Sequence, residues 1–180
     1  MYKFLLTKLD QDVYELFAHF FEQAVEREKL NVLAEKTNLS KRRIVLVFER
    51  ALDLQTAYPY FEIALHEGRE MTLYFAPNFL LSKLYSVMLE ESMPFQILDR
   101  LFSDKYVSLE ETAQQHYVSN RTVQRKLKEV ETILENYHIR LNLKRKPLFV
   151  GEEYRIRHFF HIMYWQIYDA TNVRYSGLTK

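Results

Sequence analysis

Apolar residues recur at spacings of three and four over most of the chain, and this spacing predicts a mainly helical protein. Residues 5–27 are expected to form a first helix, residues 31–36 a short second helix and residues 40–54 a third, after a turn at Asn38 and Leu39. The hydroxyl of Ser40 can cap the third helix. The apolar stripe of the first helix consists of Val13, Leu16, Phe17, Phe20, Phe21 and Val25.

The pattern changes at Pro59, which stops helical continuation. Residues 60–65 and 71–75 are rich in aromatic and β-branched side chains and enclose a polar turn, which predicts a β-hairpin. Three helices followed by a hairpin make a winged helix-turn-helix. Pro77 and Asn78 mark a boundary, beyond which helices are expected at residues 80–91 and 95–102, interrupted near Pro94.

A second helix-turn-helix is predicted at residues 107–130. Ser108 and Glu111 have the spacing of a capping box, in which each side chain bonds the other residue's backbone amide. Ser119 can cap the following helix. Residues 139–143 and 148–150 then form a second hairpin with a basic tip. The buried face of the second helix is expected to consist of Val123, Leu127, Val130 and Leu134.

The two halves align at one constant shift of 79 residues, which predicts two copies of one module. In the turns, Asn38 tolerates the left-handed backbone conformation, whereas Tyr117 adopts it poorly. The shift pairs Leu30 with Leu109, Ala34 with Ala113, Leu39 with Val118, Ser40 with Ser119, Arg42 with Arg121, Ile44 with Val123, Phe48 with Leu127 and Tyr58 with Tyr137.

The expected fold is therefore mostly α with small β-hairpin wings, arranged as tandem winged helix-turn-helix domains at residues 1–78 and 79–151. Residues 152–180 are expected to supply a C-terminal helix, over residues 152–170, that leads toward a regulatory domain absent from this chain. That helix shows more apolar surface than one helix normally does. It can pack on the second module, on a partner subunit or on the absent domain.

Composition narrows the function classes. The chain has 180 residues, 48% of them hydrophobic, and no cysteine, so it can form real cores without disulfides or thiolate metal sites. No signal peptide or apolar run long enough to span a bilayer is visible, which favours a cytoplasmic protein. Net charge is only +1, but residues 119–146 hold eight basic against three acidic side chains. Such a local surplus can form the electrostatic footprint of a DNA-binding surface.

The second module carries the main candidate DNA-binding residues. Arg121 and Arg125 can bond guanine or phosphate, and Asn120 and Gln124 can read adenine. Lys128 and the Ser119 hydroxyl suit phosphate contacts. The hairpin tip, Lys144, Arg145 and Lys146, can reach the minor groove or the neighbouring backbone. A solvated amphipathic helix pair and an ordinary charged hairpin are the competing interpretations.

In the first module, Ser40, Lys41, Arg42 and Arg43 lie at the start of the third helix, where phosphate is also attracted. Residues 44–48 are apolar on nearly all sides. This helix is therefore interpreted either as a DNA-contacting helix or, equally, as a surface for domain packing or dimerisation.

Catalytic and cofactor motifs are not evident. His158 and His161, with Glu153 nearby, are interpreted as interfacial residues because their spacing suits a two-ligand metal site poorly and no third ligand is placed. No Gly-rich phosphate loop or nucleophile elbow stands out. We expect no enzyme activity, no cofactor and no metal.

The two modules, the segment SNRTVQRKLKEV and the segment GEEYRIR resemble the N-terminal half of the Mga-type transcription regulators. Gly151, Glu153, Ile156 and Arg157 look like the G-x-E-x-x-I-R signature shared with regulators that carry phosphotransferase-regulation domains. The resemblance implies a regulator of virulence or metabolism in Gram-positive bacteria that binds double-stranded promoter DNA. It also implies regulatory domains beyond this chain and a homodimer when full length. The alternative function is a winged-helix module for protein interaction or dimerisation, without base readout.

Overall fold

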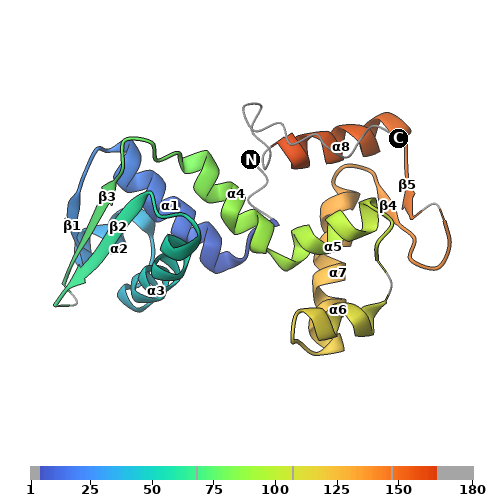
Figure 1. Cartoon of the computed structure of the whole chain (residues 1–180), viewed down its shortest axis with the longest axis horizontal. Helices are drawn as coiled ribbons and strands as arrows, with labels where there is room; N and C mark the ends of the chain where they lie inside the picture. Colours follow the sequence, from blue (N-terminus) through green and yellow to red (C-terminus); the bar gives the residue numbers. More distant parts are fainter. Residues whose placement is uncertain (1–4, 68, 107, 147, 166–180) are drawn as a thin grey trace. The chain divides into compact units, whose positions relative to one another are not determined.

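The computed structural model describes residues 5–67, 69–106, 108–146 and 148–165. These divide into two compact units, the N-terminal unit (Leu6–Leu89) and the C-terminal unit (Leu5 together with the residues from Glu90 onward). Both are built mainly from helices (Figure 1). Residues 1–4, 68, 107, 147 and 166–180, on which parts of the predicted elements and domains fall, lie outside the described part.

The N-terminal unit combines helices with one small antiparallel sheet. The sheet has the strand order β1–β3–β2, and its register pairs Arg27 with Thr72 and Phe61 with Phe75. The elements are α1 (Lys8–Glu22), β1 (Arg27–Lys29), α2 (Leu30–Thr37), α3 (Lys41–Ala57), β2 (Phe61–His66), β3 (Glu70–Phe75) and α4 (Leu81–Glu91), of which the last two residues belong to the C-terminal unit.

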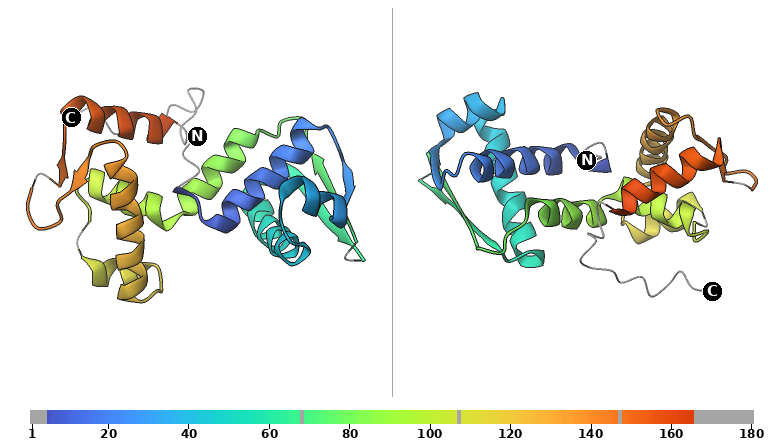
Figure 2. Two further views of the ribbon diagram at one scale, coloured as in Figure 1. Left: turned by 180° about the vertical axis from the view of Figure 1, so that it is seen from behind. Right: turned by 90° about the horizontal axis from the view of Figure 1, so that it is seen from above.

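The core of this unit lies where α1, α3 and the sheet meet. Four residues of the apolar stripe predicted for α1 are buried, namely Val13, Leu16, Phe17 and Phe20, whereas Phe21 is exposed. Figure 2 shows α1 from behind and from above, packed against α3. The ring of Phe17 meets that of Phe61 edge-on, with 4.8 Å between ring centroids. Burying each such ring is worth about 1.5–3 kcal/mol.

The sequence prediction for the first helix is wrong at its C-terminal end. The helix stops at Glu22, Ala24 takes a left-handed φ of 50°, and the Val25 amide bonds the Phe20 carbonyl at 3.1 Å. The chain then enters β1, which the sequence analysis did not predict. This strand exists because it pairs with β3, far along the chain, and local pattern does not reveal such a partner.

The C-terminal unit contains α5 to α8 and a two-stranded hairpin. Ser92 caps α5 by accepting the Phe95 amide and donates its hydroxyl to the Leu5 carbonyl at 2.7 Å. Pro94 lies in the first turn of α5, where no donor is needed, so the predicted interruption separates two helices. The elements are α5 (Met93–Phe102), α6 (Leu109–Gln115), α7 (Asn120–Glu135), β4 (Arg140–Leu141), β5 (Phe149–Val150) and α8 (Glu153–Trp165).

The β4–β5 hairpin is shorter than predicted, with two residues in each strand. One further backbone bond, from the Asn142 amide to the Leu148 carbonyl at 2.7 Å, continues its pairing. Gly151 follows β5, and a Cβ at this position would lie 2.9 Å from the His138 carbonyl oxygen. Glycine is therefore required here by the close approach of two backbone segments.

Helix α8 packs its apolar side within the C-terminal unit. Phe159, Phe160 and Met163 are buried, and Phe160 stacks on Phe102 with 4.0 Å between ring centroids. The Tyr164 hydroxyl donates to Asp99 at 2.7 Å. Of the packing partners left open by the sequence, the second module is thus the one observed for these side chains.

Candidate nucleic-acid interface

Helix α6 begins at a working N-cap. The Ser108 hydroxyl accepts the Glu111 amide at 3.1 Å, and the Thr112 hydroxyl donates to the Ser108 carbonyl at 2.8 Å. The predicted reciprocal contact from the Glu111 side chain is not what the structure shows. Its carboxylate pairs instead with Arg100 of α5, at 2.9 Å.

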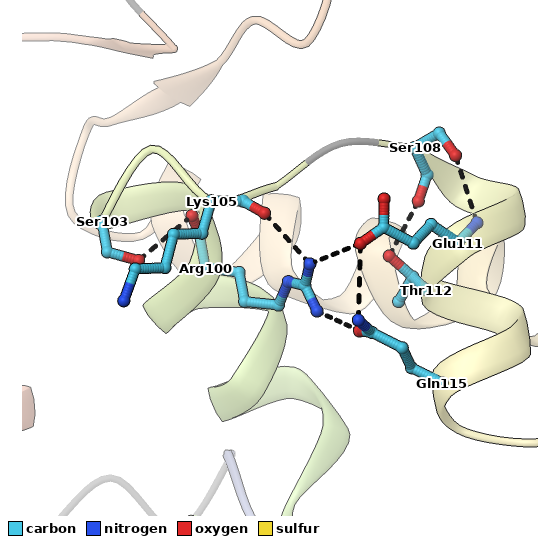
Figure 3. Close-up of polar contacts among 7 residues, drawn as sticks. All are labelled: Arg100, Ser103, Lys105, Ser108, Glu111, Thr112 and Gln115. Atoms are coloured by element: carbon cyan, nitrogen blue, oxygen red, sulfur yellow. Dashed lines mark hydrogen bonds and ion pairs between the residues drawn. The ribbon is translucent and has the colours of Figure 1, made fainter.

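Arg100 joins the end of α5 to the outer side of α6 (Figure 3). Its guanidinium donates to Glu111, to the Gln115 side chain and, at 3.0 Å, to the Lys105 carbonyl. The Arg100 side chain is 23% exposed, so these charge-assisted bonds are less screened than a surface pair. The network sets where α6, and with it the turn into α7, lies on the unit.

The turn between α6 and α7 is a Schellman motif. The Val118 amide bonds the Ala113 carbonyl at 3.0 Å and the Tyr117 amide bonds the Gln114 carbonyl at 3.2 Å. Tyr117 holds φ at 52°, so the residue for which this conformation is disfavoured nevertheless adopts it. Ala113 is buried where α6 packs on α7.

Helix α7 separates a buried face from an exposed basic one. Ser119 caps it by accepting the Thr122 amide at 3.2 Å. All four apolar positions predicted for its core, Val123, Leu127, Val130 and Leu134, are buried. The predicted readers Asn120, Arg121, Gln124, Arg125 and Lys128 and the cap residue Ser119 are all exposed, as are Glu129, Thr132 and Glu135.

The cations of α7 differ in what they contact. Lys126 pairs with Glu129 at 2.7 Å. Within the part of the chain that the structure describes, no ion pair engages Arg121, Arg125 or Lys128. These three side chains carry positive charge on the exposed side of the helix and are open to an anionic partner.

The tip of the β4–β5 hairpin is exposed at Lys144, Arg145 and Lys146. Lys146 forms an ion pair with Asp104, a left-handed residue two positions past the end of α5. The hairpin follows directly after α7 in the chain and lies toward the C-terminal end of that helix (Figure 1).

The corresponding residues of the N-terminal unit differ in whether they are exposed or bonded within the unit. Ser40 caps α3 by accepting the Arg43 amide at 3.2 Å, and Lys41 and Arg42 are exposed. The Arg43 guanidinium instead bonds Asp12 of α1 at 2.6 Å, and the Asp12 side chain is 1% exposed. This contact holds α3 against α1.

Lys41 also lines a hollow of about 910 Å³ at the hairpin tip. Other side chains that line it are Lys29 from β1 and Arg69 from the turn between β2 and β3, with the acidic Glu67 and Glu70 beside them. Lys29 was not among the predicted site residues, because the sequence pattern did not predict β1. Nothing in the sequence around Arg100 indicated its role either, since its partners lie in another element.

Two histidines are held toward their neutral form in the folded chain. Burial, with Arg100 nearby, lowers the pKa of His116, and burial together with Lys36 lowers the pKa of His19. His158 and His161 are exposed on α8. Among the described residues no group of three or more His, Asp or Glu side chains is placed to hold a metal ion.

Two comparisons with known proteins bear on this site. Residues 77–164, which include α4 to α7 and the hairpin, match the Mga helix-turn-helix domain. A curated relative, the capsule synthesis positive regulator AcpB of Bacillus anthracis, is 27% identical over 119 residues, which are 66% of this chain. The chain spans about a quarter of the length of that relative, the matched segment being 24% of it. No helix among the described residues is long and apolar enough to cross a membrane.

Proposed function

We propose that this chain is the DNA-binding part of an Mga-type transcription regulator and that α7 is its main reader of double-stranded promoter DNA. The match of residues 77–164 to the Mga helix-turn-helix domain and the likeness to a positive regulator support this assignment. The observation that carries it is the exposed face of α7, where Arg121, Arg125 and Lys128 stand opposite a fully apolar buried face.

In the proposed complex, α7 enters the major groove with its N-terminal half leading. Arg121 and Arg125 bond guanine edges, because a guanidinium matches the two guanine acceptors. Asn120 and Gln124 contact adenine in the same way. Ser119 and Lys128, at the start and on the flank of the helix, bond phosphates and fix its register.

The hairpin tip adds contacts outside the major groove. Lys144 and Arg145 reach the backbone or the minor groove. Lys146 must exchange Asp104 for a phosphate to join them. The net gain in binding free energy from Lys146 is accordingly smaller than the gain from Lys144 or Arg145.

The N-terminal unit is proposed to be a first copy of the winged helix-turn-helix, with α2 and α3 as the helix pair and β2 and β3 as the wing. Ser40, Lys41 and Arg42 then contact phosphates, with the cations of the hairpin hollow beside them. Arg43 stays a predicted DNA contact, but its bond to Asp12 favours a role in holding α3 in place. The domain bounds 1–78, 79–151 and 152–180 likewise stay part of this proposal.

The remaining features come from the family resemblance. Phosphotransferase-regulation domains and a homodimer belong to the proposed full-length regulator, of which the chain would be the N-terminal portion. The paired half-sites of a dimer would make the operator a two-fold repeat.

The experiment is selection of bound sequences from a random duplex pool, followed by binding of the winner to Arg121→Ala and Arg125→Ala. If either side chain reads a base, its loss weakens binding by about 1–3 kcal/mol and relaxes the preference at one position. Arg157→Ala is the matched control, because Arg157 is an exposed arginine of α8. Enrichment of no sequence, with both variants binding like the unaltered chain, would overturn base readout.

A second candidate function, a module for protein interaction, is favoured by one observation. Leu46 and Leu52 of α3 are exposed by 40% and 42%, so this helix presents large apolar side chains to solvent. Self-association measured by analytical ultracentrifugation, with no DNA binding, would support it.

A further inference from the structure

Tyr117 is the most exposed large apolar side chain among the described residues, at 97%. Its ring is in water and gains nothing from burial in the folded chain. An isolated exposed aromatic residue needs no explanation by itself. Here, however, the position in the turn makes a large side chain unfavourable.

The backbone at Tyr117 is left-handed, with φ at 52°. A residue with a Cβ is strained in this conformation, and glycine takes it freely. Tyrosine at this point therefore destabilises the turn and supplies no packing in return. Strained positions of this kind cluster at functional sites. Five other described residues share the left-handed conformation, so what distinguishes Tyr117 is its near-complete exposure beside the proposed reading helix.

Tyr117 lies at the edge of a hollow of about 580 Å³ that borders the proposed reading helix. Two of the residues lining it, Ser119 and Asn120, are the cap and the first residue of α7. Glu110 and Gln114 line it from successive turns of α6. The remaining lining residues, Ala113 and Val118, are the less exposed ones.

We propose that Tyr117 contacts the sugar–phosphate backbone of the duplex beside the base read by Asn120. The ring lies against a deoxyribose and the hydroxyl donates to a phosphate oxygen. Tyrosine hydroxyls are among the side-chain donors that bond phosphate in protein–DNA complexes. This inference rests on the proposed function, and continuity with Ser119 and Asn120 is what selects DNA as the occupant of the hollow.

Among the residues that the structure describes, Glu110 is the one acidic group that lines this hollow. Its exposed carboxylate repels a phosphate held by Tyr117. Replacing it as Glu110→Gln should therefore strengthen binding by about twofold at low salt, where surface charges are least screened.

The test measures thermal stability and affinity for a labelled mixed-sequence duplex in the same variants. Tyr117→Gly should unfold at a higher temperature, because the strain is gone, and should bind about fivefold more weakly, because one backbone contact is lost. Tyr117→Asn, which also tolerates the left-handed conformation, should weaken binding to a similar extent. Tyr117→Phe should lose about twofold, because it keeps the ring contact and lacks the hydroxyl.

His138→Gly is the matched control. His138 is also exposed and left-handed, with φ at 58°, but it lies three residues past the C-terminal end of α7, whereas Tyr117 precedes its N-terminus. The His138→Gly variant should gain stability and keep its affinity for the duplex. A purely structural role for Tyr117 would move affinity and stability together, whereas the proposal moves them in opposite directions.

The outcomes separate the two levels of inference. If the unaltered chain binds the duplex and both Tyr117→Gly and Tyr117→Asn bind within about twofold of it, the Tyr117 contact is refuted and the proposed function stands. If the unaltered chain does not bind at all, both are refuted. Weaker binding by both variants, with His138→Gly unchanged, supports the contact.

Discussion

Asn38 and Tyr117 hold the same left-handed backbone conformation, with φ of 54° and 52°, at positions separated by 79 residues. Each lies between a short helix and the longer helix that follows it, α2 and α3 in one unit and α6 and α7 in the other. The shift found in the sequence thus coincides with a repeated turn geometry. This relationship supports the proposal of two copies of one module.

Gly151→Ala should destabilise the C-terminal unit. The added Cβ would meet the His138 carbonyl oxygen at 2.9 Å, and backbone on both sides limits how far either can move. We expect a loss of about 1–3 kcal/mol in the free energy of unfolding, measured by urea denaturation. Arg145→Ala, in the exposed hairpin tip, should change it by less than about 0.5 kcal/mol. Equal values for the two variants would contradict the close approach.

Arg100→Met should loosen α6 from α5. It removes the bonds to Glu111 and to the Lys105 carbonyl while keeping much of the side-chain length. The expected loss is about 2 kcal/mol, because charge-assisted bonds at a partly buried site exceed surface pairs. Arg157→Met, which breaks an exposed pair with Glu153, should cost less than about 0.5 kcal/mol. DNA affinity should fall for Arg100→Met alone, since that network positions the turn.

Sequence patterns were sufficient for the features that depend on local spacing. The buried face of α7 and the caps at Ser108 and Ser119 follow from residue type and periodicity, and the structure confirms them. Partners brought together by folding were not accessible in this way. The Glu111 carboxylate pairs with Arg100 and does not complete the capping box. Arg43 pairs with Asp12, 31 residues earlier in the chain.

The strand β1 shows the same limit for backbone structure. Its three residues, Arg27, Glu28 and Lys29, are all charged and carry no strand pattern. Pairing with β3 provides the hydrogen bonds that make it a strand. The turn at Tyr117 is the opposite case, because tertiary packing of α6 on α7 overrides a local preference that was identified correctly.

Arg42→Ala and Arg43→Ala should have different consequences although the residues are neighbours. Arg43→Ala leaves the buried Asp12 carboxylate with Lys8, at 3.2 Å, as its one cationic partner among the described residues, and should cost about 2–3 kcal/mol of stability. Arg42→Ala, at an exposed position, should leave stability within about 0.5 kcal/mol and weaken duplex binding. Chemical denaturation and binding measured on both variants check this. A stable Arg43→Ala would show that the bond to Asp12 is dispensable.

Stability should decrease in mild acid through His116. Burial, with Arg100 nearby, lowers its pKa below the ordinary 6.5, so the unfolded chain binds more protons than the folded chain as the pH falls below that value. The free energy of unfolding is therefore at its full value above about pH 6.5 and falls as the pH drops through the lowered pKa. His116→Gln should reduce this dependence in urea titrations at a series of pH values. His19, whose pKa is lowered in the N-terminal unit, should account for part of what remains.

DNA recognition through α7 can be tested by the salt dependence of duplex binding, measured for the unaltered chain and for the Arg121→Ala, Arg125→Ala double variant. Log affinity of the unaltered chain should fall steeply with log salt, at about −0.9 per phosphate neutralised. The folded double variant should bind at least about tenfold more weakly at every salt concentration. Binding that ignores salt, or a double variant that binds like the unaltered chain, would contradict DNA recognition through α7.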